Sequence, residues 1–469
     1  MWTIIKNEIH FLCRNRAMLM ISFGFIVVLL ISVFLGIKQA EEQEKIYQEA
    51  KTHLRSQWVS IKEMNPHSAA HYGTYVFKPT NLLSSLDEGV NSVTGNVLRV
   101  EGHVQNEIVH SEASQMISVS KFGKLKSSLL LKFIVPLLLI FLAFYSVSSE
   151  KQSGRLKLLI LQGAKPFYIV LSKTIAVWFY GFILLSIVVL SYTLLNLSNS
   201  TSETFLRLSL LFLSYAIYYF ILIGLTIYFS TRWLRTTIAL TSMLGIWMIW
   251  SVFLPNILMS SVEKWHPLPS RAEFKTAMIE DRSKGIDGHN PSDARGEELK
   301  EKVLKEYGVD SISKLPINFD GIRMQADEDY GNIVWDKHFG NLRKVQKKQK
   351  EAFQLGGIVN PFISLQNTSM GFAGNDNLHH QEFLVQVENY RRDLIKALNN
   401  EHAFGGSKTG NWGWTANNDF YKSIPDFAYK SVALTSVLSN YVLDIALLLG
   451  WLIFILLLLI RGAKKMQVI

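Results

Sequence analysis

The chain has 469 residues, of which 49% are hydrophobic and only 18% are charged, and its formal net charge is +10. A soluble chain usually carries about 25% charged residues, whereas several apolar runs here are long enough to cross a ~30 Å hydrocarbon layer as helices, which excludes a simple soluble enzyme. The single cysteine excludes a disulfide framework and any metal site built from several cysteines.

The apolar runs predict a membrane all-α bundle of six transmembrane helices. The first run could be a signal peptide, but its 21 uncharged residues exceed a typical signal core of about 7–15 residues, so we expect a retained helix. In the second run, Lys132 can snorkel to the interface and Pro136 is tolerated because neighbouring helices satisfy the freed carbonyl. The predicted spans are residues 17–37, 129–148, 174–195, 208–229, 236–257 and 439–460.

Charge asymmetry predicts the orientation of these spans. The segments that share a side with the two termini carry thirteen lysines and arginines against two acidic residues, Glu8 and Glu150. The short loop 196–204 on the other side carries no lysine or arginine. Positive charge collects on the cytoplasmic side, so both termini and the tail 461–469 are expected to be cytoplasmic in a multi-pass protein of a bacterial inner membrane. The basic balance then reflects orientation and lipid contact, and we expect no nucleic-acid partner.

Two long segments, 38–128 and 258–438, are predicted to lie on the opposite side. Together they are far longer than connecting loops, and we expect them to form one inserted mixed α+β extracytoplasmic domain. The polar start of the first segment predicts a helix that continues from the first span. Strand-like runs follow at 72–77 and 96–105, and helical stretches occupy 296–307, 340–354 and 380–400. The Trp-containing loop 407–419 is expected close to the outer membrane interface.

Sequence motifs for catalysis are missing. The chain has no GxxxxGK[ST] phosphate loop, so ATP hydrolysis by this chain alone is not expected, and it has no HExxH, GxSxG or CxxC motif. His67 and His71, like the adjacent His379 and His380, could bind a metal, although surface or hydrogen-bonding histidines are the commoner reading. Asp444 in the sixth run could line a pathway, or it could cap a neighbour or meet water.

The connector 149–173, between the second and third runs, is the most informative segment. Its sequence from 148, SSEKQSGRLKLLILQGAKPFYIVLSK, combines an acidic residue, two glycines and a leucine-rich stretch, and ends on a lysine at the next span. An amphipathic element lying along the membrane has such a pattern, and so does a plain interfacial connector.

This connector resembles that of type 2 ATP-binding-cassette (ABC-2) permeases, in which such an element docks on the ATPase. Gly154-Arg155-Leu156 stands where Gly-Thr-Leu is usual in that family. The resemblance implies that the coupling residues are Glu150, Gly154, Arg155, Leu158, Leu159, Gln162, Gly163 and Lys173. Residues 1–16 resemble the cytoplasmic amphipathic entry helix of the same family. The entry-helix residues that this resemblance singles out are Trp2, Ile5, Glu8 and Ile9.

Further runs resemble one branch of these permeases, which carries two large extracytoplasmic insertions and an added domain of unassigned function. These runs include NPHSAAHYGTYVFKP, SSLDEGVNSVTGN and NPFISLQNTSMGFAGNDNLHHQEF. The resemblance implies a permease subunit that pairs with a second permease, as a homodimer or with a related paralogue. ATP and Mg would be bound by a separate ATPase subunit, and we expect no cofactor on this chain.

Three functions remain open at this point. The chain could export or translocate a substrate, and the nearly uncharged bundle suits an amphipathic or hydrophobic one. It could instead transmit ATP-driven force to periplasmic partners without moving solute. A membrane-anchored receptor is the third possibility, although a receptor does not need six spans with short turns between the middle four.

Overall fold

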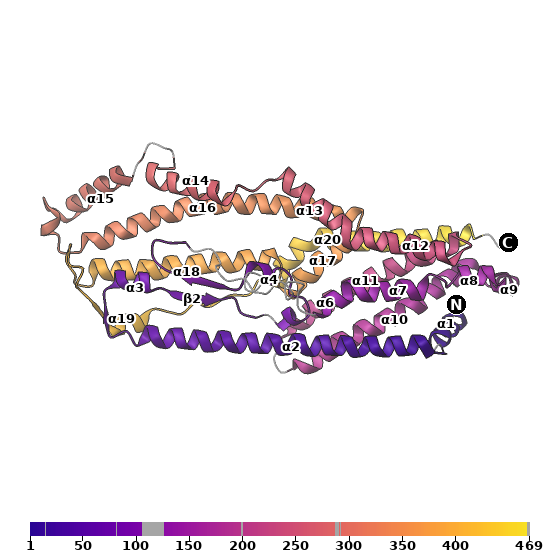
Figure 1. The fold of residues 1–469 in the computed structure, drawn as a ribbon. Helices are drawn as coiled ribbons and strands as arrows, with labels where there is room; N and C mark the ends of the chain where they lie inside the picture. The colour runs from indigo at the N-terminus through magenta and orange to yellow at the C-terminus, as the bar shows by residue number, and fades with distance from the viewer. Residues whose placement is uncertain are drawn as a thin grey trace.

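The computed structural model describes residues 1–14, 16–80, 82–105, 126–197, 200–286, 290 and 292–466. The molecule is elongated, and both termini lie at the same end of a helical bundle (Figure 1). We call this end the terminal end. The opposite end carries an outer unit, formed by the described residues of 38–105 and 266–430, and helix α2 runs from the bundle into this unit (Figure 1).

Six helices in the described residues are long and apolar enough to cross a membrane. Each predicted apolar run lies within one of them, so the prediction of six spans is confirmed. The central helix is α11, which packs against α10, α20 and the α7 segment. The six are α2 (Arg16–Val59, with the candidate span at Leu19–Val59), the run α6 to α8 (Ser127–Gln152), α10 (Pro166–Leu195), α11 (Ser202–Arg232), the run α12 to α13 (Thr236–Trp265) and α20 (Leu434–Lys464).

Two of these helices contain a π-helical turn just before a proline. The turn η3 (Leu130–Ile134) precedes Pro136, and the turn η5 (Ile249–Phe253) precedes Pro255. Proline has no N–H to donate to the preceding turn, and a π-turn is one way in which a helix adjusts its hydrogen bonds at such a site. The segments on either side are α6 (Ser127–Leu129), α7 (Val135–Ala143), α12 (Thr236–Met248) and α13 (Leu254–Trp265).

The outer unit is largely helical. Its strands in the described residues form two small antiparallel sheets, β1 (Glu63–Met64) with β4 (Ala416–Asn417), and β2 (Thr74–Phe77) with β3 (Val97–Val100). The second sheet lies in the two predicted strand-like runs, but the mixed α+β prediction holds only to this small extent. The helices are α3 (Pro66–Tyr72), α4 (Asn91–Thr94), α14 (Arg271–Lys284), α15 (Ser292–Tyr307), α16 (Phe319–Leu355), α18 (Asn377–Phe404) and α19 (Asn418–Ser423), with short 3-10 turns at η1 (Leu82–Ser85), η6 (Ile312–Lys314) and η7 (Gly356–Ile358).

A hydrophobic core joins the two inserted segments. Trp58, at the end of α2, belongs to one buried cluster with Phe383 and Leu394 of α18, and its ring contacts that of Tyr421 of α19. The Trp58 indole N–H also donates to the Tyr421 carbonyl at 3.1 Å. Since side chains from both segments are buried in one cluster, the expectation that they fold together is met.

Two elements lie elsewhere than the sequence suggested. Helix α17 (Pro361–Ala373) falls inside the second inserted segment, yet it packs against α11 and α20 and contributes Phe362 and Leu365 to the core of the bundle. The loop 407–419 was expected near the membrane interface. Its Trp412 and Trp414 carbonyls instead accept hydrogen bonds from Asn65, the residue that caps α3 far out on the outer unit (Figure 1).

Candidate coupling site at the terminal end of the bundle

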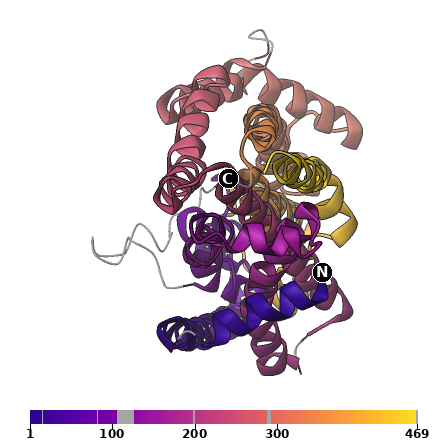
Figure 2. The same cartoon turned by 90° about the vertical axis from the view of Figure 1, so that its right-hand side faces the viewer.

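Helix α1 (Trp2–Arg14) lies across the terminal end of the bundle, at a steep angle to α2 (Figure 2). It packs against α10, with Ile5 buried and Ile9 half-buried. Trp2 faces outward and is 73% exposed. The predicted entry-helix residues therefore separate into an anchoring face and one exposed aromatic.

A buried lysine joins three elements at this end. Lys173 on α10 is 1% exposed, and its Nζ contacts Oε1 of Glu8 on α1 and, at 3.0 Å, Oε1 of Glu150 on α8 (Ser148–Gln152). Lysine has three donors and is strongly solvated in water, so its burial requires such charged partners. All three residues were singled out from the sequence, but nothing in the sequence predicted that they meet. We call this group the Lys173 triad.

The connector is held in place by glycine turns and by α11. Gly154 (φ 72°) and Gly163 (φ 90°) flank α9 (Arg155–Leu161) in the left-handed region, which glycine adopts without a Cβ clash. At the start of the connector, Ser230 Oγ of α11 accepts the backbone N–H groups of Val147 and Ser148 at 3.1 and 2.9 Å. The connector is thus fixed to the bundle at the start of α8, and a glycine turn lies on each side of α9.

The apolar residues of α9 divide into two faces. Leu156 is buried, and Leu159 is half-buried against the bundle core. Leu158 and Leu161 point outward and are 60% and 75% exposed. Leu161 was missed in the sequence because a continuous run of Leu and Ile does not show which side of a one-and-a-half-turn helix faces the bundle. Arg155 and the segment 162–163 are also exposed.

A second polar cluster lies where the bundle meets the outer unit, and we call it the junction. Lys132 does not snorkel as predicted: it is 7% exposed, and its Nζ lies 2.6 Å from Oδ2 of the buried Asp87. Ser369 of α17 donates to the same carboxylate at 2.5 Å, and the Asn375 amide donates to the Asp87 carbonyl at 2.6 Å. The junction therefore joins the first inserted segment, the second span and α17. Gly89 (φ 55°) is part of it, because a Cβ there would lie 2.0 Å from the Asn375 carbonyl oxygen.

Asp444 of α20 is fully buried, and amide donors occupy both of its carboxylate oxygens. Gln354 of α16 donates to Oδ2 at 2.5 Å, and Asn367 of α17 donates to Oδ1 at 2.9 Å. This geometry favours a structural role in tying α20 to the outer unit over a role in a pathway.

The predicted histidine pairs have different surroundings. His379 Nδ1 contacts Asp376, and its Nε2 lies 3.4 Å from the Arg207 guanidinium, so this histidine is engaged within the junction. His380 is buried, and burial together with the charge of Lys78 lowers its pKa to about 4.

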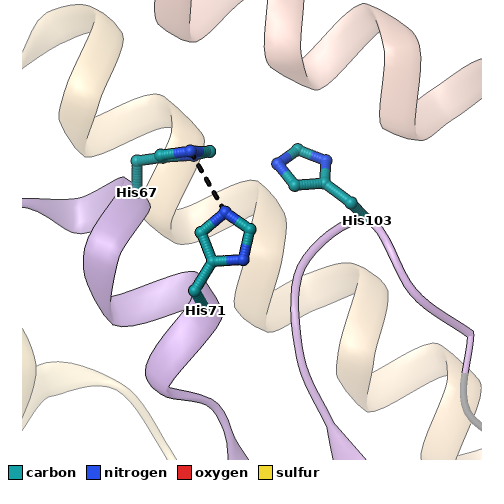
Figure 3. Close-up of side chains that lie close together, drawn as sticks. All are labelled: His67, His71 and His103. Atoms are coloured by element: carbon teal, nitrogen blue, oxygen red, sulfur yellow. Dashed lines mark hydrogen bonds between the residues drawn. The ribbon is translucent and has the colours of Figure 1, made fainter.

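His67 and His71 on α3 come together with His103, which follows β3 (Figure 3). The two Nε2 atoms of His67 and His71 are 3.2 Å apart, and one ring nitrogen of each of the three histidines lies within 4.8 Å of the others. Burial, with His71, His103 and His402 nearby, lowers the pKa of His67 to about 4. Within the described residues, these three histidines are a group whose ring nitrogens lie close enough together to hold one metal ion. The sequence singled out His67 and His71, but His103 is too distant along the chain to be linked to them.

Two family models match the chain. Residues 2–276 match the ABC-2 family transporter protein model, and residues 271–430 match a domain of unknown function (DUF3526). The first match covers more than half of the chain. The chain belongs to the ABC-2 transporter family. No curated protein matches it.

The two matches meet at the start of α14 of the ABC-2 permease, where they overlap over residues 271–276. The first covers α1, five of the six candidate spans and the connector, and the second begins at Arg271, the first residue of α14, and continues to Lys430. Members of this family are membrane components of ABC transporters and not the ATPases themselves, so membership implies a separate ATPase subunit. The predicted resemblance, including the added domain, is confirmed.

Proposed function

We propose that this permease couples ATP hydrolysis in a separate ATPase subunit to export or translocation of an amphipathic or hydrophobic substrate. In this proposal the terminal end of the bundle is cytoplasmic, in the inner membrane of a bacterium, and the ATPase docks on α9. The observation that carries it is the exposure of Leu158 and Leu161 on a short helix beside the Lys173 triad. Exposed leucines next to a fixed polar anchor are typical of a surface that a protein partner covers.

The contacts of the Lys173 triad support a mechanism in which α9 and α1 move together when the ATPase acts on the connector. We call these two helices the input lever. A push on the connector reaches α10 through Glu150 and Lys173, and it reaches α1 through Glu8. Since α1 leads into α2, the same motion is passed to a continuous helix that enters the outer unit. Two such permeases, identical or related, would form the path between their bundles, and their helices would tilt as rigid bodies between two states.

The docking surface is tested by co-purification of the tagged permease with its ATPase subunit. Leu158→Asp and Leu161→Asp should each lower ATPase recovery and ATPase stimulation, because a carboxylate would be buried in the interface without a partner. Ile279→Asp is the matched control, since Ile279 on α14 is 67% exposed but lies on the outer unit. It should leave both readings unchanged.

Unchanged ATPase recovery and activity with both Leu158→Asp and Leu161→Asp would show that α9 is not the docking surface. Protease or labelling experiments that place residues 150–172 on the periplasmic side would also contradict the proposal.

A force-transmitting role without solute movement is the second candidate, and α2 favours it. This single helix of 44 residues is about 66 Å long at ~1.5 Å per residue and joins α1 to the core of the outer unit. Arg55 near its end donates to the Ile424 carbonyl at 2.8 Å and pairs with Asp426 at 3.3 Å. ATP-dependent substrate movement in liposomes that contain only the permease and its ATPase would favour transport over this role.

A further inference from the structure

We infer that His67, His71 and His103 form a binding site for one divalent transition-metal ion of the zinc or copper type on the outer unit. The site lies on the other end of the molecule from the connector, since α3 lies far out on the outer unit and α9 at the terminal end (Figure 1). It is independent of the proposed ATPase coupling.

The first two ligands are set by a helix. His67 and His71 are four residues apart on α3, and this spacing places both rings on one face. Their Nε2 atoms, 3.2 Å apart, already have the separation of two ligands around one ion. Metal–nitrogen bonds of about 2.05 Å at a tetrahedral angle give roughly 3.3 Å between nitrogens. Asn65 fixes this turn, because its side chain accepts the His67 and Ser68 backbone N–H groups.

The third ligand is brought to α3 by the chain that follows β3. The Gly102 N–H donates to the Ala70 carbonyl at 2.9 Å, and a Cβ on Gly102 would lie 3.1 Å from the Ala70 Cβ. His103 then adopts φ 61°, and among the described residues it is the one non-glycine residue with positive φ. Such a conformation is disfavoured for a residue with a Cβ and is often found at binding sites. Here it directs the ring toward His67 and His71 (Figure 3).

A carboxylate holds the His103 ring in the orientation that a ligand needs. His103 Nδ1 lies 3.0 Å from Oε1 of Glu328, and the His103 backbone N–H donates to the same oxygen at 2.7 Å. Arg391 binds the other oxygen of Glu328 at 2.9 Å. With Nδ1 engaged, Nε2 is left as the ligating atom, which is the arrangement of a carboxylate–histidine–metal unit. Glu328 is therefore a positioning residue.

The donor set selects the ion. Three neutral imidazoles without a directly facing thiolate or carboxylate suit Zn²⁺ or Cu²⁺ better than Ca²⁺ or Mg²⁺, which prefer oxygen ligands. To bind one ion, the His103 ring would have to move toward the other two by at most roughly 1.5 Å, because nitrogens that lie within 4.8 Å of one another must come to about 3.3 Å. His71 is exposed, so an ion can enter, and a fourth position stays open for water or a donor from another molecule.

The test is zinc binding to the full-length permease, purified in detergent with a tag that contains no histidines. Calorimetric titration with Zn²⁺ alone should give one ion per chain. His71→Gln and His103→Gln should each weaken binding more than about tenfold, and Glu328→Gln should weaken it by roughly 10- to 100-fold. His53→Gln, at an exposed position on α2, is the matched control and should bind as the unaltered chain does.

The ligand set is read independently of affinity. With Cu²⁺ in place of Zn²⁺, electron paramagnetic resonance should show coupling to three imidazole nitrogens, and His71→Gln should reduce this number to two. Thermal unfolding of each variant separates loss of the site from loss of the fold. Three results would each overturn the assignment: the unaltered chain fails to bind one ion, His71→Gln and His103→Gln bind zinc as tightly as the unaltered chain, or the spectrum shows fewer than three nitrogens.

Discussion

Two of the lysines buried in the described part of this permease, Lys132 at the junction and Lys173 at the terminal end, have different surroundings. Lys132 faces Asp87, which is 4% exposed and also accepts a hydrogen bond from Ser369. Lys173 faces Glu8 and Glu150, whose side chains are 20% and 16% exposed, and Glu150 belongs to the same connector as the outward-facing leucines of α9. The junction is closed by the chain's own residues, whereas the coupling site is partly open. This difference is expected if the junction transmits motion and the coupling site receives it.

The largest loss of stability should come from breaking the ion pair between Lys132 and Asp87 at the junction. Lys132→Met leaves the Asp87 carboxylate buried without its cation, and removing one partner of a buried ion pair costs about 3–5 kcal/mol of unfolding free energy. Thermal unfolding in detergent, followed by size-exclusion chromatography, measures the loss. The double variant Asp87→Asn with Lys132→Met should recover most of it, because no lone charge remains. A single variant as stable as the unaltered chain would show that the junction is more open to water than the structure indicates.

The next prediction uses the pH dependence of stability to test whether the region around His380, close to the junction, is closed to water. The pKa of His380 is about 4 in the folded chain, below its ordinary value of 6.5, because burial and Lys78 disfavour the charged ring. The unfolded chain therefore binds the extra proton between these values. The stability that His380 contributes is complete above about pH 6.5 and is lost as pH falls to about 4, with an upper limit of about 3 kcal/mol.

His380→Gln should make the unfolding midpoint of the outer unit less dependent on pH in this window. His53→Gln, on the exposed side of α2, should leave the pH dependence as it is. The measurement is the apparent melting temperature from pH 7 to pH 4, read by tryptophan fluorescence. Equal slopes for His380→Gln and the unaltered chain would contradict the burial of this ring.

The same contrast explains what the sequence predicted and what it did not. Six apolar runs are a local property, so composition and length were enough to predict the spans. The Lys173 triad brings together residues 8, 150 and 173, each of which was singled out, because each lies in a motif that is continuous in sequence. Their pairing depends on how α1 crosses the bundle, which no local pattern encodes.

The junction was largely beyond sequence reasoning, and for a physical reason. Asp87 and Ser369 are 282 residues apart, and neither lies in a periodic segment that predicts burial. Lys132 was expected to snorkel because a lone lysine near the end of an apolar run usually does. The α+β expectation held only in part, since the β-like composition at 72–77 and 96–105 produced one small two-stranded sheet beside long helices.

A smaller effect is expected from Lys173, and it should be on function more than on stability. Lys173→Met removes charge-assisted hydrogen bonds worth about 1.5–3 kcal/mol. If these bonds hold the input lever together, stimulated ATPase activity in proteoliposomes should fall by roughly 10- to 100-fold, while the ATPase still co-purifies through Leu158 and Leu161. Lys165→Met, at the exposed start of α10, should have little effect. Loss of ATPase binding with Lys173→Met would show that the triad forms part of the docking surface itself.

The smallest predicted effect concerns the turn between α8 and α9. Gly154 adopts φ 72°, and no heavy atom lies within 4 Å of where a Cβ would be, so Gly154→Ala introduces backbone strain without a clash. The strain should destabilise this turn by about 1–2 kcal/mol and increase hydrogen exchange in residues 153–163. Gly296→Ala is the control, because Gly296 lies in α15 with open space around it, and there alanine should stabilise the helix by up to about 1 kcal/mol. Gly154 lies between the start of the connector, which is hydrogen-bonded to α11, and α9, which carries the exposed leucines. If hydrogen exchange becomes faster only in α9, the boundary between the closed part of the molecule and the partly open coupling site runs through this turn. Exchange that also rises at the junction would show that the two regions are one cooperative unit.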